Sequence, residues 1–430
     1  MAVAERELAS VVRQAAAAGQ RISISGARHS MGGQTLMPNG IIIDMEPLKQ
    51  MRLDEKREIL TVGAGARWRE VIAYLDHFGR AVTVMQSDND FSVGGSLSVN
   101  CHGWQHNSPP IASTVESLRL IRADGTVVTC SPTENTELFH LALGGYGLFG
   151  IILEARLRTV PNEYYKDERH LVSPADYATT YHELTTGAAA AGMAYGRISV
   201  APHSFLHEAE ITVLRRQENR GALPATQTNE TPNWIKRAVV RGEVGSDYGK
   251  NLRWFLEKHF GESGNLVRTR NQVMNEPSEW FLNRDPADTE ILHEYFIPGD
   301  QLAGFLEQAR GVFQKYHPDL LNITVRNVMA DDVSYLAYAH EEVFGLVMLF
   351  HLPISTAADD RLKELNQALL DVALAHRGTY YLPYRLHATR AQLLRAYPKA
   401  EQFFALKRQY DPGEIFQNQF YRTYGKPDPR

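Results

Sequence analysis

The segment from Ile22 to Met45 constrains the fold of this chain most strongly. It opens with the alternation Ile22 to Ser25, typical of a half-buried strand, and returns as Ile41 to Ile43, typical of a fully buried strand. The turn between them is rich in glycine and small polar residues, so its backbone N–H groups can approach an anion closely. Arg28 adds positive charge and His29 adds an imidazole. Such a loop suits a pyrophosphate with a reactive ring beside it.

Composition limits the classes of protein that remain. With 430 residues and 43% hydrophobic content, the chain can bury a large core and is expected to form two domains. The net charge of −5 and the pI near 6.4 give no basic footprint for nucleic acid. Two cysteines, Cys101 and Cys130, make neither a disulfide framework nor a cysteine-rich metal site, so no metal is expected.

The first residues predict an amphipathic helix, because Leu8, Val11, Val12 and Ala15 share one helical face. They lack the apolar core of a signal peptide. No apolar run in the chain approaches the roughly 18–20 residues that a membrane span needs. We therefore expect a cytoplasmic protein without a membrane span.

Residues 1 to 160 alternate strands, turns and helices in an order that predicts an α+β domain rather than a doubly wound sheet. Asp124-Gly125 is a strong hairpin signal. The expected strands cover 59–65, 81–85, 115–121, 126–129 and 151–160, and the expected helices cover 68–78 and 137–143.

Residues 162 to 385 have longer strands and form a second expected domain. The expected strands cover 195–200, 208–214 and 346–352, the expected helices cover 300–316 and 357–377, and a polar segment, 216–232, is expected to be an exposed loop. From Thr389 the chain is helical again, over 391–397 and 400–409.

Two further glycine-rich stretches bear on the ligand. The block from Phe91 to Ser113 is rich in Gly, Ser and Asn, and so long an irregular segment inside a domain is usually functional. Together with the first loop it indicates a large, extended ligand. Gly145 to Gly150 matches GxGxxG literally, but a dinucleotide fingerprint follows a strand and opens a helix. Here a helix precedes and a strand follows, which argues against a nicotinamide-dependent reductase.

Four motifs, taken in order, resemble those of the vanillyl-alcohol-oxidase or PCMH-type FAD-linked oxidoreductases. Gly26 to Gln34 is similar to the GxGHSxxGQ loop of cytokinin dehydrogenases, and Phe91 to Ser98 to their xTVGGTLS segment. Leu143 to Ile152 resembles LGGLGQFGVIT, and Tyr381 and Tyr410 begin YLP and YDP signatures. Ser96 to Gly103 also resembles a stretch of alditol oxidases. The resemblance covers residues 20 to 160 well and 380 to 420 moderately.

The resemblance implies FAD, with its pyrophosphate on the first loop and its isoalloxazine carried by His29 through an 8α-histidyl bond. The alternative is that His29 only hydrogen-bonds the cofactor. Berberine-bridge-type relatives attach FAD a second time through a Cys before the Gly-Gly, whereas Cys101 follows it, so one attachment is expected. The expected cofactor-binding residues are Gly26, Ala27, Arg28, His29, Ser30, Gln34, Ser87, Asp88, Ser92, Gly95, Ser98, His102, Ile152, Tyr381 and Gln419.

The sequence differs from both cytokinin dehydrogenases and alditol oxidases at the residues expected to contact the substrate. Cytokinin dehydrogenases have an Asp base where this chain has Ser87, with Asp88 next and Asp90 close by. Alditol oxidases have E-x-R where this chain has Thr324 and Arg326, and their C-terminal His and Lys are not clearly present. Neither a cytokinin nor a polyol substrate is therefore assigned. The expected catalytic residues are Asp88, Asp90, Arg326, Tyr384 and His387.

The sequence thus predicts a PCMH-type, two-subdomain FAD-binding domain over 1–160, a sheet-and-helix substrate domain over 161–387, and a return to the FAD domain over 388–430. The expected reaction oxidises a CH–OH or CH–NH group by hydride transfer to flavin N5, with reoxidation by oxygen or another acceptor. A flavin-binding sensor without turnover is the alternative.

Overall fold

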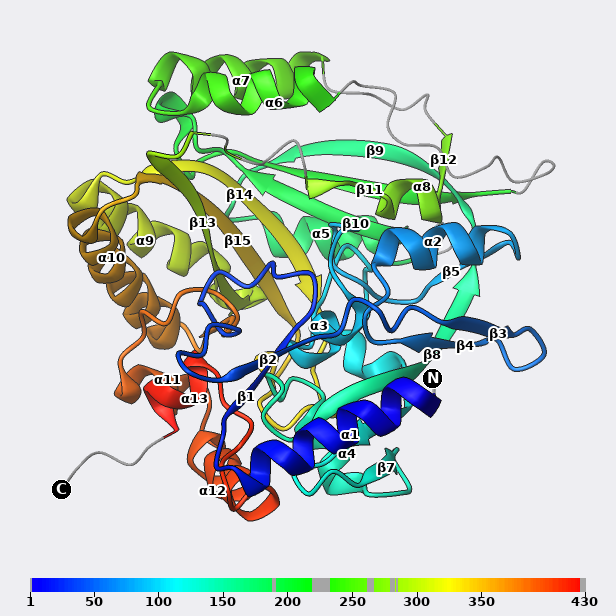
Figure 1. Cartoon of the computed structure of the whole chain (residues 1–430). Coiled ribbons are helices and arrows are strands. Elements are labelled where there is room, and N and C mark those ends of the chain that lie inside the picture. Colours follow the sequence, from blue (N-terminus) through cyan, green and yellow to red (C-terminus); the bar gives the residue numbers. More distant parts are fainter. Residues whose placement is uncertain are drawn as a thin grey trace.

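Two β-sheets dominate the computed structural model, which describes residues 2–187, 191–218, 233–260, 267–278, 283 and 285–425 (Figure 1). The polar segment expected at 216–232 lies mostly outside the described residues: β11 (Ala209–Gln217) reaches into its start, and 219–232 are not described. The mixture of sheets and helices confirms the expected α+β class.

The first sheet has the strand order β3–β4–β8–β6–β7, with β5 paired to β8. Its strands are β3 (Met51–Asp54), β4 (Ile59–Gly63), β5 (Arg80–Val82), β6 (Val115–Ile121), β7 (Val127–Cys130) and β8 (Ile151–Pro161). The accompanying helices are α1 (Ala2–Ala17), α2 (Trp68–Asp76), α3 (Val93–Ser98) and α4 (Thr136–Ala142). Trp68, Val71, Ile72 and Leu75 of α2 are fully buried, as the helical spacing predicted.

The second sheet is reached directly from the first, because β9 begins three residues after β8 ends. Its order is β12–β9–β11–β10–β14–β15–β13–β16, and all its pairings are antiparallel. Besides β11, its strands are β9 (Tyr164–Val172), β10 (Ala191–Ile198), β12 (Val267–Thr269), β13 (Asp288–Pro298), β14 (Asp319–Val328), β15 (Val343–Pro353) and β16 (Thr379–Tyr380).

The two faces of this second sheet are covered by different helices. α5 (Tyr177–Thr185), α9 (Leu302–Tyr316) and α10 (Thr356–Ala375) pack on it, and Figure 1 shows α9 and α10 beside β13. Alternate residues of a strand face opposite sides of a sheet. On β13, Tyr295 bonds to Asn366 of α10, whereas Leu292 and Glu294 line a cavity on the opposite face. On that opposite face, α6 (Asn233–Glu243) and α7 (Asp247–Phe260) reach only one end, where Glu257 pairs with Arg197 and Arg241 pairs with Glu290, and the rest is available to a ligand.

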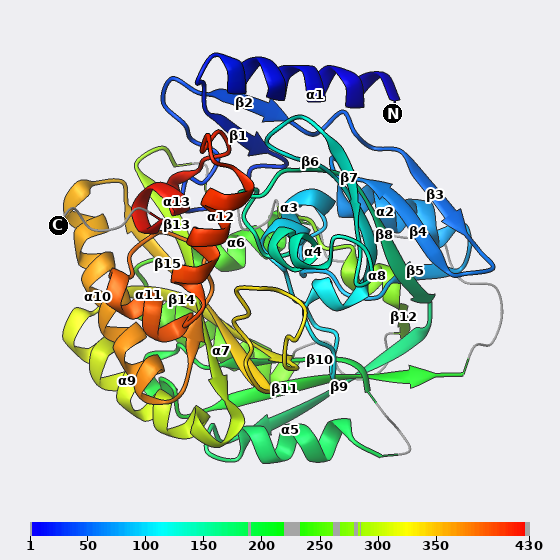
Figure 2. The same ribbon diagram turned by 90° about the horizontal axis from the view of Figure 1, so that it is seen from below.

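The remaining helices lie at the two ends of the molecule. α6 and α7 lie at the top of Figure 1, and α8 (Arg270–Met274) follows β12. α11 (Arg390–Ala396), α12 (Ala400–Tyr410) and α13 (Gln419–Tyr424) bring the chain back to its beginning (Figure 2). There Ile22 of β1 (Ile22–Ser25) donates to the carbonyl of Ile415 and pairs with Phe416.

Several sequence expectations need correction. β1 pairs in parallel with β2 (Ile41–Asp44), but Ile42 is 47% exposed, so β2 is not a fully buried strand. Ser23 and Ser25 are buried, so β1 is not half-buried on its serine side. The block after Phe91 is not wholly irregular, because Val93–Ser98 forms α3. Its glycines fit a short helix there because they allow close packing against Ala64.

Candidate functional site

A cavity of about 820 Å³ lies between the glycine-rich loop after β1, helix α3 and the face of the second sheet opposite α9 and α10. A volume of this size is typical of sites for cofactors and other large ligands. The cavity is continuous from the loop at Gly26 to Arg197 on β10. Both glycine-rich segments singled out in the sequence therefore face one space.

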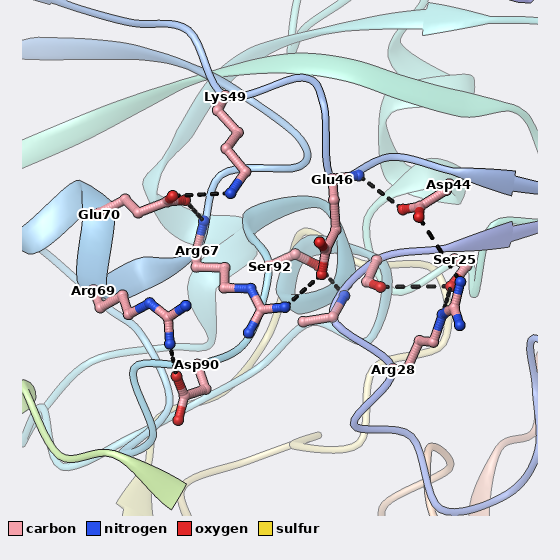
Figure 3. Close-up of polar contacts among 12 residues, drawn as sticks. Ser25, Arg28, Asp44, Glu46, Lys49, Arg67, Arg69, Glu70, Asp90 and Ser92 are labelled. Atoms are coloured by element: carbon pink, nitrogen blue, oxygen red, sulfur yellow. Dashed lines mark hydrogen bonds and ion pairs between the residues drawn. The ribbon is translucent and has the colours of Figure 1, made fainter.

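The loop after β1 is packed so tightly that only glycine fits at its start. A Cβ at Gly26 would lie 2.1 Å from Ser92 Oγ, and that same hydroxyl accepts a hydrogen bond from Ala27 N at 3.3 Å. Arg28 holds a left-handed backbone conformation with φ 61°, which non-glycine residues adopt mainly where function or packing demands it. Its Nε donates to Ser25 Oγ at 2.9 Å, and its head group stays exposed (Figure 3).

His29 follows and is held by the segment that precedes α3. Its ring stacks on Phe91 with centroids 4.2 Å apart and planes at 17°. Burial lowers the pKa of His29, which outweighs the raising effect of the Asp90 carboxylate. The imidazole is therefore neutral near pH 7, the form in which a ring nitrogen is a nucleophile.

The glycines of the other motifs allow close approach of the backbone. A Cβ at Gly94 would lie 2.8 Å from Ala64 Cβ, and one at Gly150 would lie 2.4 Å from the Ile121 carbonyl oxygen. Gly147 and Gly150 both line the cavity. The GxGxxG match follows α4 and precedes β8, as predicted, so it does not open a helix.

The second sheet forms the opposite wall of the cavity through alternating residues of its strands. On β14 these are Asn322, Thr324 and Arg326, and on β15 they are Val347 and Leu349. Thr324 stands opposite Val347 in the register, and Asn322 stands opposite Leu349. At about 3.3 Å per residue, the three β14 side chains span roughly 13 Å from Asn322 to Arg326.

Asp88 and Arg326 meet where this wall approaches the glycine-rich loop. Arg326 Nη2 donates to Ser87 Oγ at 2.8 Å, and its Nη1 donates to the His102 carbonyl oxygen at 3.4 Å. Asp88 lines the cavity, as Arg326 does. Burial raises its pKa to about 7, with Arg326 opposing this rise and Glu276 adding to it.

Glu294 is a buried acid of the cavity that the sequence analysis missed. Its Oε1 lies 2.8 Å from His102 Nε2, and its Oε2 accepts a 3.4 Å hydrogen bond from Tyr384 Oη. Burial raises the pKa of Tyr384 well above its usual value, so this tyrosine keeps its proton. The sequence signal that could have identified Glu294 is an acidic residue on the cavity-facing side of a strand, between Leu292 and Phe296.

A charged cluster at the far end of the cavity was also missed. Arg197 donates to Asn322 Oδ1 at 2.6 Å and pairs with Glu257 of α7 at 2.5 Å. Arg169 donates to the backbone carbonyl oxygen of Glu257 at 2.9 Å. Arg253 Nε pairs with the side-chain carboxylate of Glu257 at 2.8 Å. These arginines come from three separate elements, so no local sequence motif indicated that they would lie together.

Most of the predicted site residues line this cavity. They are Gly26, Ala27, Arg28, His29, Ser30, Gln34, Ser87, Asp88, Ser92, Gly95, Ser98, His102, Ile152, Arg326, Tyr381 and Tyr384.

Three predicted residues do not line the cavity. The carboxylate of Asp90 is taken by Arg69 at 2.5 Å and by two hydrogen bonds from Ser278 (Figure 3 draws Arg69 and Asp90). His387 bonds to Asn366 and stacks on His293, so it lies on the face of the sheet that α10 covers. Gln419 donates to the backbone carbonyl oxygen of Leu36, which is not one of the cavity-lining residues.

The residues present fit a flavin dinucleotide. The close-packed start of the glycine loop brings its backbone to the cavity, and His29 lines the cavity beside it. The amide oxygen Oε1 of Gln34 is buried on the cavity wall and has no hydrogen-bond partner among the described residues, although the Nε2 of this side chain donates to the Pro383 carbonyl oxygen at 3.1 Å. A buried acceptor of this kind is suited to a donor on a bound ligand.

In the described ranges, no group of three or more His, Cys, Asp or Glu side chains is arranged to hold a metal ion. Within the same ranges, no helix combines the length and the apolar character needed to cross a membrane.

Comparison with known proteins agrees with this geometry. Residues 2–131 match the FAD binding domain family. Over 95% of this chain and 83% of the relative, the sequence is 26% identical to cytokinin dehydrogenase 7 of Oryza sativa subsp. japonica. Cytokinin dehydrogenase 9 of that plant is 32% identical, but the match spans only 36% of this chain and 31% of the relative. D-arabinono-1,4-lactone oxidase of Yarrowia lipolytica is 31% identical over 39% of this chain and 32% of the relative. The likeness to alditol oxidases stays a prediction.

Proposed function

We propose that the chain, which is similar to FAD-binding oxidoreductases of the PCMH type, oxidises a CH–OH or CH–NH group of a small molecule. One observation carries the proposal: the glycine loop with His29 and the pair Asp88 and Arg326 line one continuous cavity. Bound FAD supplies the two-electron acceptor, with N5 as the atom that takes the hydride. A donor held in this cavity would be aligned with that atom, which supplies much of the rate acceleration.

Asp88 is the residue to which we assign the heteroatom proton. A general base works best when its pKa lies near the working pH, and the pKa of Asp88 is raised to about 7. Arg326, held by Ser87, places positive charge beside it and stabilises a developing alkoxide or anchors an anionic group. Tyr384 and Glu294 complete the polar wall at this end of the cavity.

We also propose that His29 carries the flavin through an 8α-histidyl bond. Its neutral imidazole and its fixed, stacked position beside the loop support this assignment. The alternative is a hydrogen bond from His29 to reversibly bound FAD. The part of the chain from 161 to 387, which supplies the sheet wall, would select the substrate, and 388–430 would complete the FAD domain.

The electron acceptor is oxygen or another oxidant. A sensor without turnover is the second candidate, motivated by Thr324 at the position of the family Glu. Against it, Asp88 and Arg326 still face the cavity together. A nicotinamide-dependent reductase is disfavoured because α4 precedes, and β8 follows, the GxGxxG match.

Three measurements on the purified protein test the proposal. The visible spectrum should show flavin bands, and a colourless protein that refuses added FAD would contradict the proposal. Acid precipitation should leave the yellow colour in the pellet, whereas a colourless pellet excludes the covalent bond. Anaerobic mixing with a panel of alcohols, sugars and amines should bleach the flavin with one class of donor. A yellow protein that no donor bleaches would favour the sensor.

A further inference from the structure

Thr324 ends a chain of hydrogen bonds whose direction is fixed. Arg197 Nη2 donates to Asn322 Oδ1 at 2.6 Å, and Asn322 Nδ2 donates to Thr324 Oγ1 at 2.9 Å. A guanidinium donates hydrogen bonds and cannot accept them, so the amide oxygen of Asn322 must face Arg197. The amide nitrogen then faces Thr324, whose oxygen accepts from it and whose O–H is left to donate to another group.

Arg197 is held in place by a carboxylate of α7. Its Nη1 lies 2.5 Å from Glu257 Oε1, and Arg253 Nε lies 2.8 Å from the same oxygen. The strand register also fixes the chain of hydrogen bonds, because Arg197 of β10 stands opposite Thr324 of β14. The direction of these hydrogen bonds is therefore set by a paired charge rather than by free rotation of an amide.

The O–H of Thr324 is available to a ligand. Thr324 is half-buried and lines the cavity. In the described part of the chain, Asn322 is the hydrogen-bond partner of this side chain, and it uses a lone pair of the hydroxyl oxygen, not the hydrogen. A ligand with an acceptor beside Thr324 would complete the chain. A ligand without one would leave the O–H unpaired once water is excluded, which weakens binding.

The walls beside this hydroxyl are apolar. On the β10 side, Tyr195 precedes Arg197 by two residues and so lies on the same face, and its ring stacks on Trp104 with centroids 4.6 Å apart. On the β15 side, Val347 stands opposite Thr324. Tyr195, Trp104 and Val347 all line the cavity. This part of the cavity thus combines apolar walls with one directed donor.

Arginines near Thr324 are neutralised by carboxylates, as Arg197 is. Arg253 pairs with Glu243. Arg169 pairs with Glu210 at 3.1 Å. An anionic group placed here would have to break one of these ion pairs, and it would also face the carboxylate of α7 that lines the cavity. This part of the cavity therefore favours a neutral group.

We propose that Thr324 selects the substrate, an inference that rests on the proposed function. The substrate class is a neutral ring compound that carries a hydrogen-bond acceptor, such as an ether, carbonyl or ring oxygen, away from the carbon that is oxidised. Thr324 and Arg326 are two residues apart on β14, so the acceptor and the oxidised carbon should be separated by roughly 7 Å. Asn322 and Arg197 are positioning residues, because they act on the substrate only through Thr324.

Matched ring alcohols test this class. The probes are cyclohexylmethanols with a methoxy, an ethyl or a carboxylate group on the opposite ring carbon, in the trans form. Anaerobic stopped-flow reduction of the flavin-loaded protein gives a dissociation constant and a limiting rate for each, and perturbation of the flavin spectrum gives the dissociation constant of a probe that is bound but not oxidised. We expect wild type to bind the methoxy compound about tenfold more tightly than the ethyl compound, and more tightly than the carboxylate.

Thr324→Val removes the O–H and keeps the branched shape of the side chain. It should raise the dissociation constant of the methoxy compound about tenfold, leave that of the ethyl compound within about twofold, and change the limiting rate little. Thr324→Ser keeps the donor and should keep the preference for the methoxy compound. Thr289→Val is the control, because Thr289 lines the cavity outside the hydrogen-bond chain, and it should keep that preference too.

Asn322→Asp tests the direction of the hydrogen-bond chain without altering Thr324. An ionised carboxylate only accepts hydrogen bonds, so the O–H of Thr324 should turn to it and no longer serve the substrate. The preference for the methoxy compound should then fall to less than about twofold.

Equal binding of the methoxy and ethyl compounds by wild type would overturn the proposal, as would a preference that survives in Thr324→Val or in Asn322→Asp. Tighter binding of the carboxylate would overturn the neutral class. Failure of all the probes to bind would also overturn the proposal, whereas bleaching of the flavin by another donor would leave the oxidoreductase proposal standing. A protein that takes up no flavin would contradict the proposed function itself.

Discussion

The carboxylate of Glu294 occupies the space that a side chain at Gly345 would need. A Cβ at Gly345 would lie 2.9 Å from Glu294 Oε1 and 3.0 Å from Phe296 Cε1. Gly345 stands opposite Arg326 of β14 in the strand register. The missing side chain therefore lets a carboxylate from β13 lie beside the strand position of Arg326.

Gly345→Ala should force this carboxylate out of place. Overpacking of a buried site of this kind costs about 1–3 kcal/mol of unfolding free energy. We also expect slower flavin reduction by the donor that the panel identifies. Urea denaturation and anaerobic stopped-flow absorbance measure the two effects. Gly311→Ala is the control, since its Cβ meets nothing within 4 Å on α9, and it should leave stability equal or higher.

Asp88→Asn should change stability in a pH-dependent manner. The pKa of Asp88 in the folded protein is raised to about 7 from 3.8, so the folded state holds a proton that the unfolded state has lost between these values. Its contribution to stability is full below pH 3.8 and is lost as pH rises to about 7. The variant should therefore gain about 1–3 kcal/mol relative to wild type between pH 5 and pH 8. An equal difference at both pH values would contradict the raised pKa.

Arg326→Ala should move the pH profile of flavin reduction. The positive charge of Arg326 opposes the rise in the pKa of Asp88. Without it, that pKa goes up, so the rising limb on the acidic side of the profile should move above pH 7 and the maximal rate should fall. Arg326→Lys keeps the charge but loses the two-pronged contact with Ser87 and the His102 carbonyl. It should keep the wild-type midpoint with a reduced rate.

Gly26→Ala should abolish flavin binding, because the Cβ of the new alanine would lie 2.1 Å from Ser92 Oγ. The ratio of flavin absorbance to protein absorbance measures the loss. Adding Ser92→Gly removes the clashing atoms and should restore part of the flavin content. Ser92→Gly alone loses the hydrogen bond from Ala27 N and should bind FAD with only moderately lower affinity. A double variant as empty as Gly26→Ala would show that this clash is not the cause.

Lys407→Met should destabilise the C-terminal part of the chain. Lys407 Nζ pairs with Asp411 Oδ2, and both side chains are almost completely buried. Asp411 also accepts hydrogen bonds from Ile415 N and Phe416 N. Removing one partner of a buried ion pair costs about 3–5 kcal/mol. Lys49→Met, which breaks a half-exposed pair with Glu70, should cost less than about 1 kcal/mol, so urea denaturation separates the two.

The glycine loop could be read from the sequence because its chemistry is local. Gly26, His29 and Ser92 lie in short motifs whose close approaches follow from residue type. The helix α2 was equally readable, since its buried residues recur at helical spacing. The local geometry of such motifs can be inferred from about ten consecutive residues.

The sheet wall could not be read in the same way, because it depends on register between distant strands. Arg197 comes to lie beside Thr324 only through the pairing of β10 with β14. The error over His387 has the same origin. Its nearness in sequence to Tyr384 gave no sign that it packs on His293, on the far face of the sheet from Glu294.

The return of the chain to its beginning has a consequence for how the protein is made. Ile22 is bonded on both sides by Ile415 and Gln417, and Asn418 donates to the Tyr146 carbonyl oxygen beside the glycine motif. A nascent chain on the ribosome lacks these partners until Asn418 has emerged. Cofactor capture should therefore follow the synthesis of this segment, and translation products that stop before it should be left colourless.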